Sequence, residues 1–221
     1  MARYATMEGV DASDQSKLSL TERRKETTRL EISHRAAELF SDAQAESVTA
    51  DSIAKASGVG LRTFYRYFRT KEDAIAPLLE NGVGDWLNLI ESTPASVSIG
   101  VTLEQAARRS FTELRTSTEN VALVRRLLRV VVHDPALLNV WLRVVNDTEI
   151  KLISVLETRM RPGTDPLEIQ LFAVAANTAQ RMAISAWVHG AEPESAENEP
   201  VDVAVRCLRI LTAGLDTDAH A

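Results

Sequence analysis

Hydrophobic residues recur along most of the chain at the three- and four-residue intervals of amphipathic helices, and no segment shows the strict alternation of a strand. The first stripe of this kind is formed by Ile32, Ala36, Leu39 and Phe40. Just before it, residues 19–22 read Ser-Leu-Thr-Glu, which fits a capping box. The pattern predicts a helix over residues 19–41. Residues 1–18 are polar and lack periodicity, so we expect a mobile tail there.

Local start and stop signals divide the rest of the chain into further helices. Asp134 and Asp165 are each followed by proline, the combination of an N-cap with proline at the first helical position, which predicts helices over 135–160 and 166–189. A second capping box at residues 102–105 predicts a helix to residue 116, after a loop over 93–100. Helices over 119–132 and 200–214 complete the body. Nine helices and no strand predict an all-α fold.

Residues 48–71 read VTADSIAKASGVGLRTFYRYFRTK, the outline of two short helices joined by a tight turn. Thr49 is a natural N-cap for the first of them and Gly60 can cap the second. Gly58 lies where the turn calls for a left-handed residue. The apolar residues available to join the two helices are Ile53, Ala54, Val59, Phe64 and Phe68. This spacing predicts a helix-turn-helix; the alternative is an ordinary helical hairpin with a solvated basic face.

The second of these helices carries the side chains suited to DNA. Arginine and threonine contact base edges and phosphates in the major groove, and tyrosine contacts phosphates. For Tyr65 an alternative role is open, because its ring can instead pack within the small domain. The candidate DNA-binding residues are Thr49, Gly60, Leu61, Arg62, Thr63, Tyr65, Arg66, Tyr67 and Lys71.

Over residues 21–80 the chain resembles the TetR family of bacterial transcriptional regulators. The resemblance rests on the Ile53-Ala54 start, the Gly58-Val59 turn and the segment Tyr65-Arg66-Tyr67-Phe68 with its exit to Lys71. Where the family usually carries Ser-Lys-Gly, this chain has Gly60-Leu61-Arg62, and we expect Arg62 to replace the missing cation. The resemblance implies a DNA-binding domain over residues 19–70 and a ligand-binding and dimerisation domain over 71–221. It also implies phosphate contacts for Thr49 and Lys71.

The fourth helix is expected to begin near Lys71, capped by Thr70, and to link these two domains. Pro77 lies inside it and should bend it or end its first segment.

Charge is distributed unevenly between the two parts of the chain. The net charge is −6, which by itself argues against a nucleic-acid partner. However, residues 21–71 hold ten Lys and Arg against seven Asp and Glu, whereas residues 72–221 hold thirteen against twenty-one. A basic module on an acidic body is expected to bind DNA with one end only.

The family resemblance implies further sites in the body. In proteins of that family the last two helices pair with their copies in a second subunit. The matching apolar residues of this chain are Leu171, Val174, Thr178, Met182, Trp187, Val205, Leu208 and Leu211. A monomer with a thick core is the alternative. The family also places an effector cavity among the middle helices. The candidate lining residues are Trp86, Phe111, Arg115, Leu128, Trp141, Val145 and Asn177.

Other classes of function have little support in the sequence. The four histidines lack metal-ligand spacing, and there is no phosphate-binding loop or nucleophile elbow, so we expect no catalytic residue, metal or cofactor. A single cysteine and the lack of a long apolar run indicate a cytoplasmic protein without a membrane partner. We therefore expect a homodimeric regulator that binds a palindromic DNA operator and is released by a small apolar or amphipathic ligand. The alternative is a helical ligand-binding or scaffold protein with a non-functional DNA module, and activator versus repressor is left open.

Overall fold

The computed structural model describes residues 19–42, 47–116, 118–190 and 199–215, and for residues 112–120 only the backbone. Within these ranges the regular structure is entirely helical, with nine α-helices and one short 3₁₀ helix. The prediction of an all-α fold is confirmed. The expected tail over residues 1–18 lies outside the described residues.

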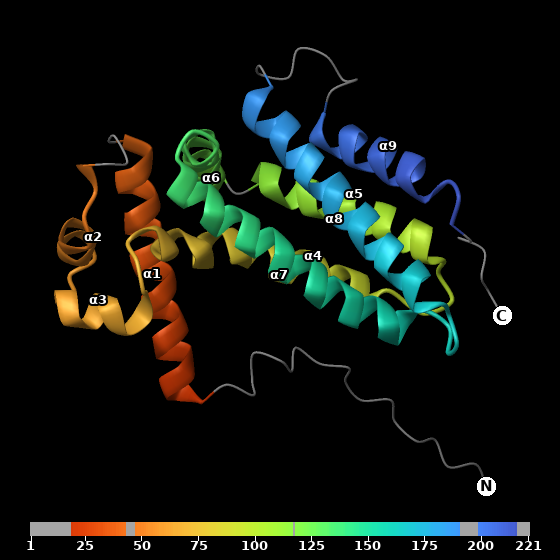
Figure 1. Ribbon diagram of the computed structural model, residues 1–221, viewed down its shortest axis with the longest axis horizontal. Coiled ribbons are helices and arrows are strands. Elements are labelled where there is room, and N and C mark those ends of the chain that lie inside the picture. Colours follow the sequence, from red (N-terminus) through yellow and green to blue (C-terminus); the bar gives the residue numbers. More distant parts are fainter. Residues whose placement is uncertain (1–18, 43–46, 117, 191–198, 216–221) are drawn as a thin grey trace, which may run out of the picture.

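A small N-terminal group of helices lies at one end of the molecule and a larger bundle at the other (Figure 1). The N-terminal group comprises α1 (Leu20–Asp42), α2 (Ala50–Ala56) and α3 (Leu61–Tyr67). The bundle comprises α5 (Ile99–Thr116), α7 (Pro135–Arg159), α8 (Pro166–His189) and α9 (Pro200–Thr212). Two helices connect these groups: α4 (Ala76–Ser92) runs from one into the other, and α6 (Thr118–Val131) packs against both α1 and α8.

The N-terminal group has the expected helix-turn-helix geometry. Thr49 is the N-cap of α2: its hydroxyl accepts a hydrogen bond from the Ser52 amide, and the Ser52 hydroxyl accepts one from the Thr49 amide, both at 3.0 Å. Gly58 has φ +67°, the left-handed conformation that glycine adopts without a Cβ clash, so the turn prediction is confirmed. Gly60 is the N-cap of α3. The predicted hydrophobic contact is also present, since Ile53, Ala54, Phe64 and Phe68 are buried and Val59 packs against them.

The entry to α4 is more segmented than a single helix. Thr70 and Asp73 cap each other, the side chain of each accepting from the amide of the other at 3.1 Å. A 3₁₀ helix over Glu72–Ile75 follows, and α4 begins only at Ala76. Pro77 lies in the first turn of α4, where its missing N–H costs nothing. The predicted start of this α-helix near Lys71 is therefore wrong, and Pro77 lies at its beginning rather than inside it.

The predicted start of the next helix is also wrong. The capping box expected at residues 102–105 does not exist, because α5 already begins at Ile99. Ser98 precedes the helix, and its side-chain oxygen accepts from the Val101 amide at 3.3 Å. Thr102 is instead fully buried inside the helix, where its hydroxyl accepts a hydrogen bond from Arg159 of α7 at 3.0 Å. Thr102 therefore has the sequence pattern of a helix cap, but its hydroxyl instead binds Arg159 where α5 packs against α7.

The hydrophobic core of the N-terminal helices extends into the body. One cluster of buried residues joins Ile32 and Phe40 of α1 with Phe64 of α3, and continues through Leu127 of α6 to Leu137 of α7. A second cluster fills the bundle between α4, α5, α7, α8 and α9. Because close-packed side chains transmit displacement, a change at α6 or α7 bears directly on the helices that carry the helix-turn-helix.

Candidate DNA-binding surface and ligand cavity

The two faces of α3 differ in chemistry. Phe64 is completely buried and anchors the helix on the module's core, while Arg62 and Arg66 are exposed. Thr63 is partly exposed, and Gly60 and Leu61 lie exposed at the start of the helix. Arg62 forms no ion pair or hydrogen bond with any described residue. A duplex laid along this face would therefore meet a cation that has no competing partner.

The two tyrosines of α3 differ in how far they are exposed to solvent. The Tyr65 ring is 54% exposed and meets the Phe64 ring edge-on at 5.5 Å between centroids, so it combines contact with the core and access from solvent. Tyr67 is partly buried against the core. The Arg66 guanidinium lies 5.4 Å from the centroid of the Tyr67 ring, a cation–π contact that directs this arginine along the helix surface.

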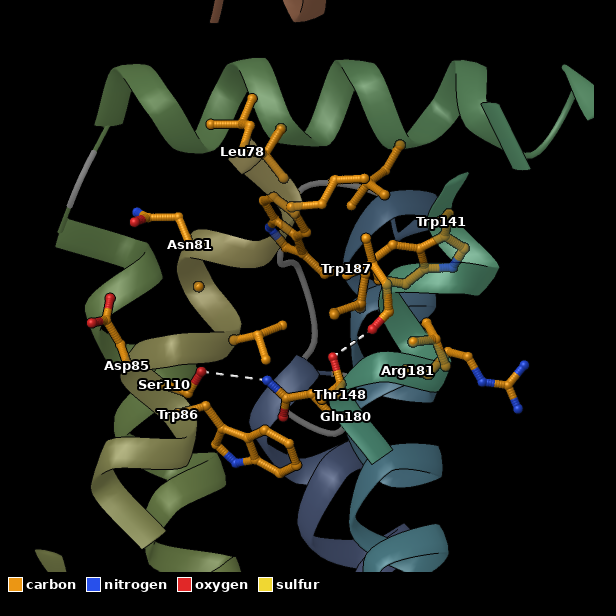
Figure 2. A pocket seen from close by; sticks show the side chains of 18 of the residues that line it. Leu78, Asn81, Asp85, Trp86, Ser110, Trp141, Thr148, Gln180, Arg181 and Trp187 are labelled. Atoms are coloured by element: carbon orange, nitrogen blue, oxygen red, sulfur yellow. Dashed lines mark hydrogen bonds between the residues drawn. The ribbon is translucent and has the colours of Figure 1, made fainter. Parts of the chain in front are cut away.

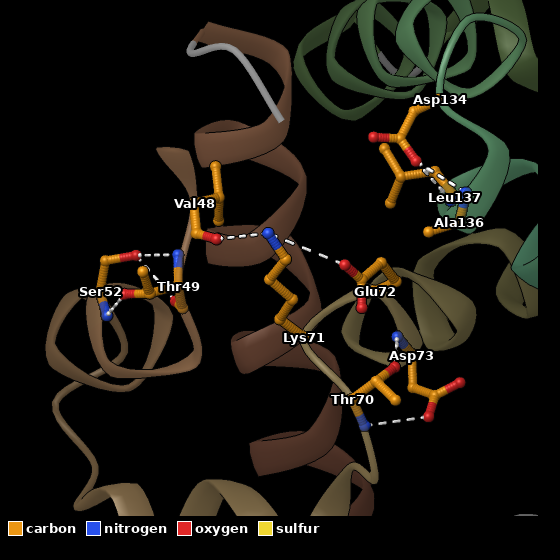
Figure 3. Close-up of polar contacts among 10 residues, drawn as sticks. All are labelled: Val48, Thr49, Ser52, Thr70, Lys71, Glu72, Asp73, Asp134, Ala136 and Leu137. Carbon is orange, nitrogen blue, oxygen red and sulfur yellow. Dashed lines mark hydrogen bonds and ion pairs between the residues drawn. The ribbon is translucent and has the colours of Figure 1, made fainter. Parts of the chain in front are cut away.

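Lys71 is held by the protein itself. Its ammonium donates a hydrogen bond of 2.6 Å to the carbonyl oxygen of Val48, and lies 3.8 Å from the Glu72 carboxylate (Figure 3). The side chain is only 27% exposed and its ammonium lies 6.0 Å from the centre of the Phe40 ring. The expected role in phosphate binding is thus joined by a structural one: Lys71 fixes the residue before the N-cap of α2 to the entry of α4.

The Thr49 hydroxyl can still donate a hydrogen bond after capping α2. Its hydroxyl oxygen accepts from the Ser52 amide, whereas its hydroxyl proton is used by no described residue. The residue is exposed at the start of the helix (Figure 3). The proton is available to a phosphate oxygen.

Between the two helix groups lies a cavity of about 420 Å³. Its wall is mostly apolar and contains three tryptophans, Trp86, Trp141 and Trp187, of which Trp86 is almost fully buried (Figure 2). Helices α4, α6, α7 and α8 supply most of the wall, and Ser110 comes from α5. Leu30 and His34 of α1 also reach it. The cavity therefore touches the helix that supports the DNA-binding module.

The predicted cavity residues are brought together only in part. Trp86, Leu128, Trp141, Val145 and Asn177 all line it. Phe111 does not, because it is buried in the second core cluster, so that expectation is corrected. The side chain of Arg115 lies outside the described residues.

The predicted dimer residues on α8 fall on two different faces of that helix. Leu171, Val174 and Met182 are exposed, with Thr178 partly exposed between them, and their spacing of three and four residues makes one continuous stripe. Trp187 lies five residues beyond Met182, which turns it to the other side of the helix. It lines the cavity and is partly buried, and the Arg125 guanidinium lies 5.9 Å from the centre of its ring. It therefore does not belong to the exposed stripe formed by the other residues.

The residues expected on α9 divide in the same way. Leu211 is exposed, as is its neighbour Ile210, whereas Val205 and Leu208 are buried inside the protomer. Leu208 belongs to the core cluster in which α9 packs on α5 and α8, and neither side chain offers more than a small surface to a second subunit. Cys207 lies at the edge of the exposed stripe, with its sulfur 3.6 Å from that of Met182.

Sequence reasoning missed several residues of the cavity wall. Leu30 and His34 belong to a helix expected to serve DNA binding alone, and nothing in the local pattern shows that its far face reaches the body. Thr148 and Gln180 are polar residues within apolar helices and gave a signal that could have been used, since a buried polar side chain needs a partner or a ligand. Among the described residues no cluster of three or more His, Cys, Asp or Glu side chains is arranged for a metal ion. None of the described helices is both long and apolar enough to traverse a lipid bilayer.

An all-α body joined to an N-terminal helix-turn-helix is typical of a class of DNA-binding regulators, and comparison with known proteins supports this class. Residues 32–75 match the family model described as bacterial regulatory proteins, tetR family. No curated protein matches the chain in sequence. These residues of the N-terminal domain are therefore similar to the TetR family of regulators.

Solved structures extend the similarity to the whole fold. NalD of Pseudomonas aeruginosa, the secondary repressor of the MexAB-OprM multidrug efflux pump, has a TM-score of 0.55 at 20% identity, over 89% of this chain and 99% of that one. The SmeT–triclosan complex has a TM-score of 0.54 at 17% identity, over 88% and 95%. AlkX of Dietzia, a TetR family repressor implicated in biodegradation of n-alkanes, has a TM-score of 0.52 at 21% identity, over 86% and 99%. At these identities the likeness establishes a common fold.

Proposed function

We propose that the protein is a homodimeric transcriptional repressor that binds a palindromic operator through α3 and is released from it by a small ligand in the cavity. The observation that carries the proposal is the division of α3 into a buried anchor, Phe64, and an exposed face with Arg62 and Arg66. A short helix held at its base and cationic on its outer side is suited to the major groove.

The dimer is supported by exposed apolar surface on two neighbouring helices. Leu171, Val174 and Met182 of α8, with Ile210 and Leu211 of α9, are each at least 43% exposed. Helices α8 and α9 pack against each other more extensively than any other pair, so the exposed residues lie on adjoining surfaces. Burying such a patch against its own copy removes it from water and generates the two-fold symmetry that a palindrome requires.

Release by a ligand is supported by the position of the cavity. Leu30 and His34 from α1 lie in its wall together with Leu78 and Leu79 from the start of α4. A ligand that separates these residues displaces α1 relative to α4, and therefore changes the orientation of α3. The ligand can release DNA in this way only if it binds the arrangement of α1 and α4 that does not fit the operator more tightly than the arrangement that does. NalD and SmeT, which share the fold, are repressors of multidrug efflux pumps, and SmeT has been crystallised with triclosan.

A mobility-shift assay with the DNA upstream of the chain's own coding sequence tests this function. We expect wild-type protein to retard the fragment, an Arg62→Ala, Arg66→Ala double variant to lose the complex, and the exposed-site control Arg161→Ala to keep it. No complex with this fragment or with selected genomic fragments would favour the alternative of a ligand-binding protein with an inactive DNA module. A transcription assay with the bound fragment placed before a reporter gene distinguishes repression from activation.

A further inference from the structure

The cavity contains a polar side chain whose orientation is fixed by the protein. Asn177 is 7% exposed, and its Nδ2 donates to the carbonyl oxygen of Val145 and to Oε2 of Glu149, both at 3.1 Å. A carbonyl and a carboxylate oxygen both accept and do not donate, so the amide cannot turn over without losing both hydrogen bonds. Its Oδ1 is left as an acceptor. No described residue donates to this oxygen, and it is not fully enclosed by protein.

A second fixed acceptor lies on the facing helix. The hydroxyl of Thr148 donates its only proton to the carbonyl oxygen of Val144 at 2.6 Å (Figure 2). The oxygen can then only accept from a ligand. Thr148 is three residues from Val145, the residue that holds Asn177, so both acceptors face the same stretch of the cavity.

The neighbouring Gln180 is adaptable where Asn177 is not. Its Nε2 lies 3.4 Å from the Ser110 hydroxyl, which can either donate or accept, and its Oε1 is buried without a partner among the described residues (Figure 2). This amide can turn to present oxygen or nitrogen to a ligand. Gln180 therefore does not decide whether a ligand must donate or accept a hydrogen bond. Asn177 and Thr148, which can only accept, require a ligand that donates.

The charged groups at the cavity do not reverse this requirement. Asp85 and Arg181 are exposed, and Figure 2 shows the Arg181 guanidinium directed away from Trp86 and Gln180. His34 lies on the α1 side of the wall and is partly exposed. A carboxylate or ester brings only acceptor oxygens. It could accept from the Trp86 indole N–H, which is buried without a partner among the described residues, but it would leave Asn177 Oδ1 and Thr148 Oγ1 facing an acceptor without a proton between them.

We infer that the effector carries a hydrogen-bond donor, a hydroxyl or an amine, on an apolar body, and that Asn177 Oδ1 and Thr148 Oγ1 accept from it. This rests on the proposed function, in which the cavity holds the effector. The volume lies within the range of pockets that bind small molecules and is sufficient for an apolar body of two fused rings. Three tryptophans in the wall provide flat surfaces for rings of that size.

Isothermal calorimetry on the full chain with matched compounds tests the inference. The probes are 2-naphthol, 2-naphthylmethylamine, 2-methoxynaphthalene and 2-naphthoate, with the corresponding four compounds built on indane and biphenyl. We expect a hydroxyl or amine member to bind at least tenfold more tightly than the methyl ether and the carboxylate of its own scaffold, because the ether leaves the acceptors unpaired. The hydroxyl and amine arms separate a neutral donor from a cationic one.

Two variants connect the preference to the named atoms. Thr148→Val keeps the side-chain shape without the oxygen and should reduce the preference for the donor severalfold, and Asn177→Leu should reduce it further. Circular dichroism establishes that each variant is folded; if Asn177→Leu does not fold, Thr148→Val and the wild-type series decide. Equal or tighter binding of the ethers or carboxylates, an unchanged preference in the folded variants, or binding of none of the compounds would overturn the inference.

The operator assay keeps this test separate from the proposed function. Methyl ethers that bind and release DNA would overturn the donor requirement while supporting ligand-controlled release. Donor compounds that bind by the predicted margin but leave the DNA complex intact would support the donor requirement and contradict release.

Discussion

Replacing Lys71 with methionine separates two roles that both fit its position at the end of the helix-turn-helix. Methionine keeps an apolar stem beside Phe40 but removes the ammonium that donates to the Val48 carbonyl at 2.6 Å. A hydrogen bond from a charged group contributes about 1.5–3 kcal/mol when buried. The Lys71 side chain is 27% exposed, so solvent screening reduces this contribution, and we expect a loss of about 1–2 kcal/mol.

Thermal unfolding followed by circular dichroism measures this loss. For a chain of this length each kcal/mol lowers Tm by roughly 2–4 °C, so the variant should melt about 2–8 °C below the wild type. The matched control is Arg69→Met, which removes an exposed cation two residues earlier and should leave Tm unchanged.

DNA titrations at several salt concentrations complete the comparison. Each cation that contacts a phosphate contributes roughly 0.9 to the slope of log K against log salt. If Lys71→Met melts like the wild type and only reduces that slope by about one, Lys71 is a phosphate ligand and the structural role is refuted. A lowered Tm with an unchanged slope would instead exclude the phosphate contact.

Further predictions concern helix ends and the junction between the two helix groups. Gly190→Ala should lower Tm, because the added Cβ would lie 2.8 Å from the backbone oxygen of Ala186, one turn earlier. Gly84→Ala in α4 is the contrasting variant: its Cβ meets no atom within 4 Å, so it should stabilise the protein by about 0.5–1 kcal/mol. Melting curves of the two variants check both predictions. For Asp73, burial alone would raise the pKa, but hydrogen bonds from Arg143 and Thr70 outweigh it and hold the pKa below the usual value. Its stabilising contribution is therefore present above about pH 4 and lost as the pH falls further, so the Tm deficit of Asp73→Asn should shrink in acid, and a deficit constant from pH 7 to pH 3 would contradict this assignment.

Features encoded by neighbouring residues could be predicted from the sequence. The N-cap at Thr49, the left-handed turn at Gly58 and the buried anchor Phe64 each follow from residues within one or two turns of helix. The two cap-and-proline pairs likewise gave the starts of α7 and α8 at Pro135 and Pro166. Such signals depend on neighbouring residues alone, and for this reason the sequence shows them.

Features that depend on distant partners could not be read. Thr102 has the pattern of a cap but is buried by Arg159, 57 residues away. Ser33 of α1 accepts from the Leu78 amide at 3.0 Å, which satisfies the backbone at the start of α4 from another helix. Trp187 had the right periodicity for an apolar face, but only the arrangement of α6 and α8 decides which face borders the cavity.

The same arrangement explains why the two sites are physically connected. Arg125 and Arg129 of α6 donate to the carbonyl oxygens of Gly190 and Val188 at 2.6 and 3.1 Å, and thereby hold the C-terminal end of α8. Helix α6 also packs along α1 and contributes Leu128 to the cavity wall. A displacement of α6 by a ligand would thus reach the DNA-binding module through direct packing.

Selection of bound duplexes from a randomised pool tests directly whether α3 reads DNA through its exposed arginines. At one fixed salt concentration, the wild type should enrich a palindrome whose half-sites lie about one helical turn apart, and Arg62→Ala should lose about 1–3 kcal/mol of preference at a single position of each half-site. Enrichment of no common sequence by the wild type, or an identical preference in the Arg62→Ala variant, would contradict the account.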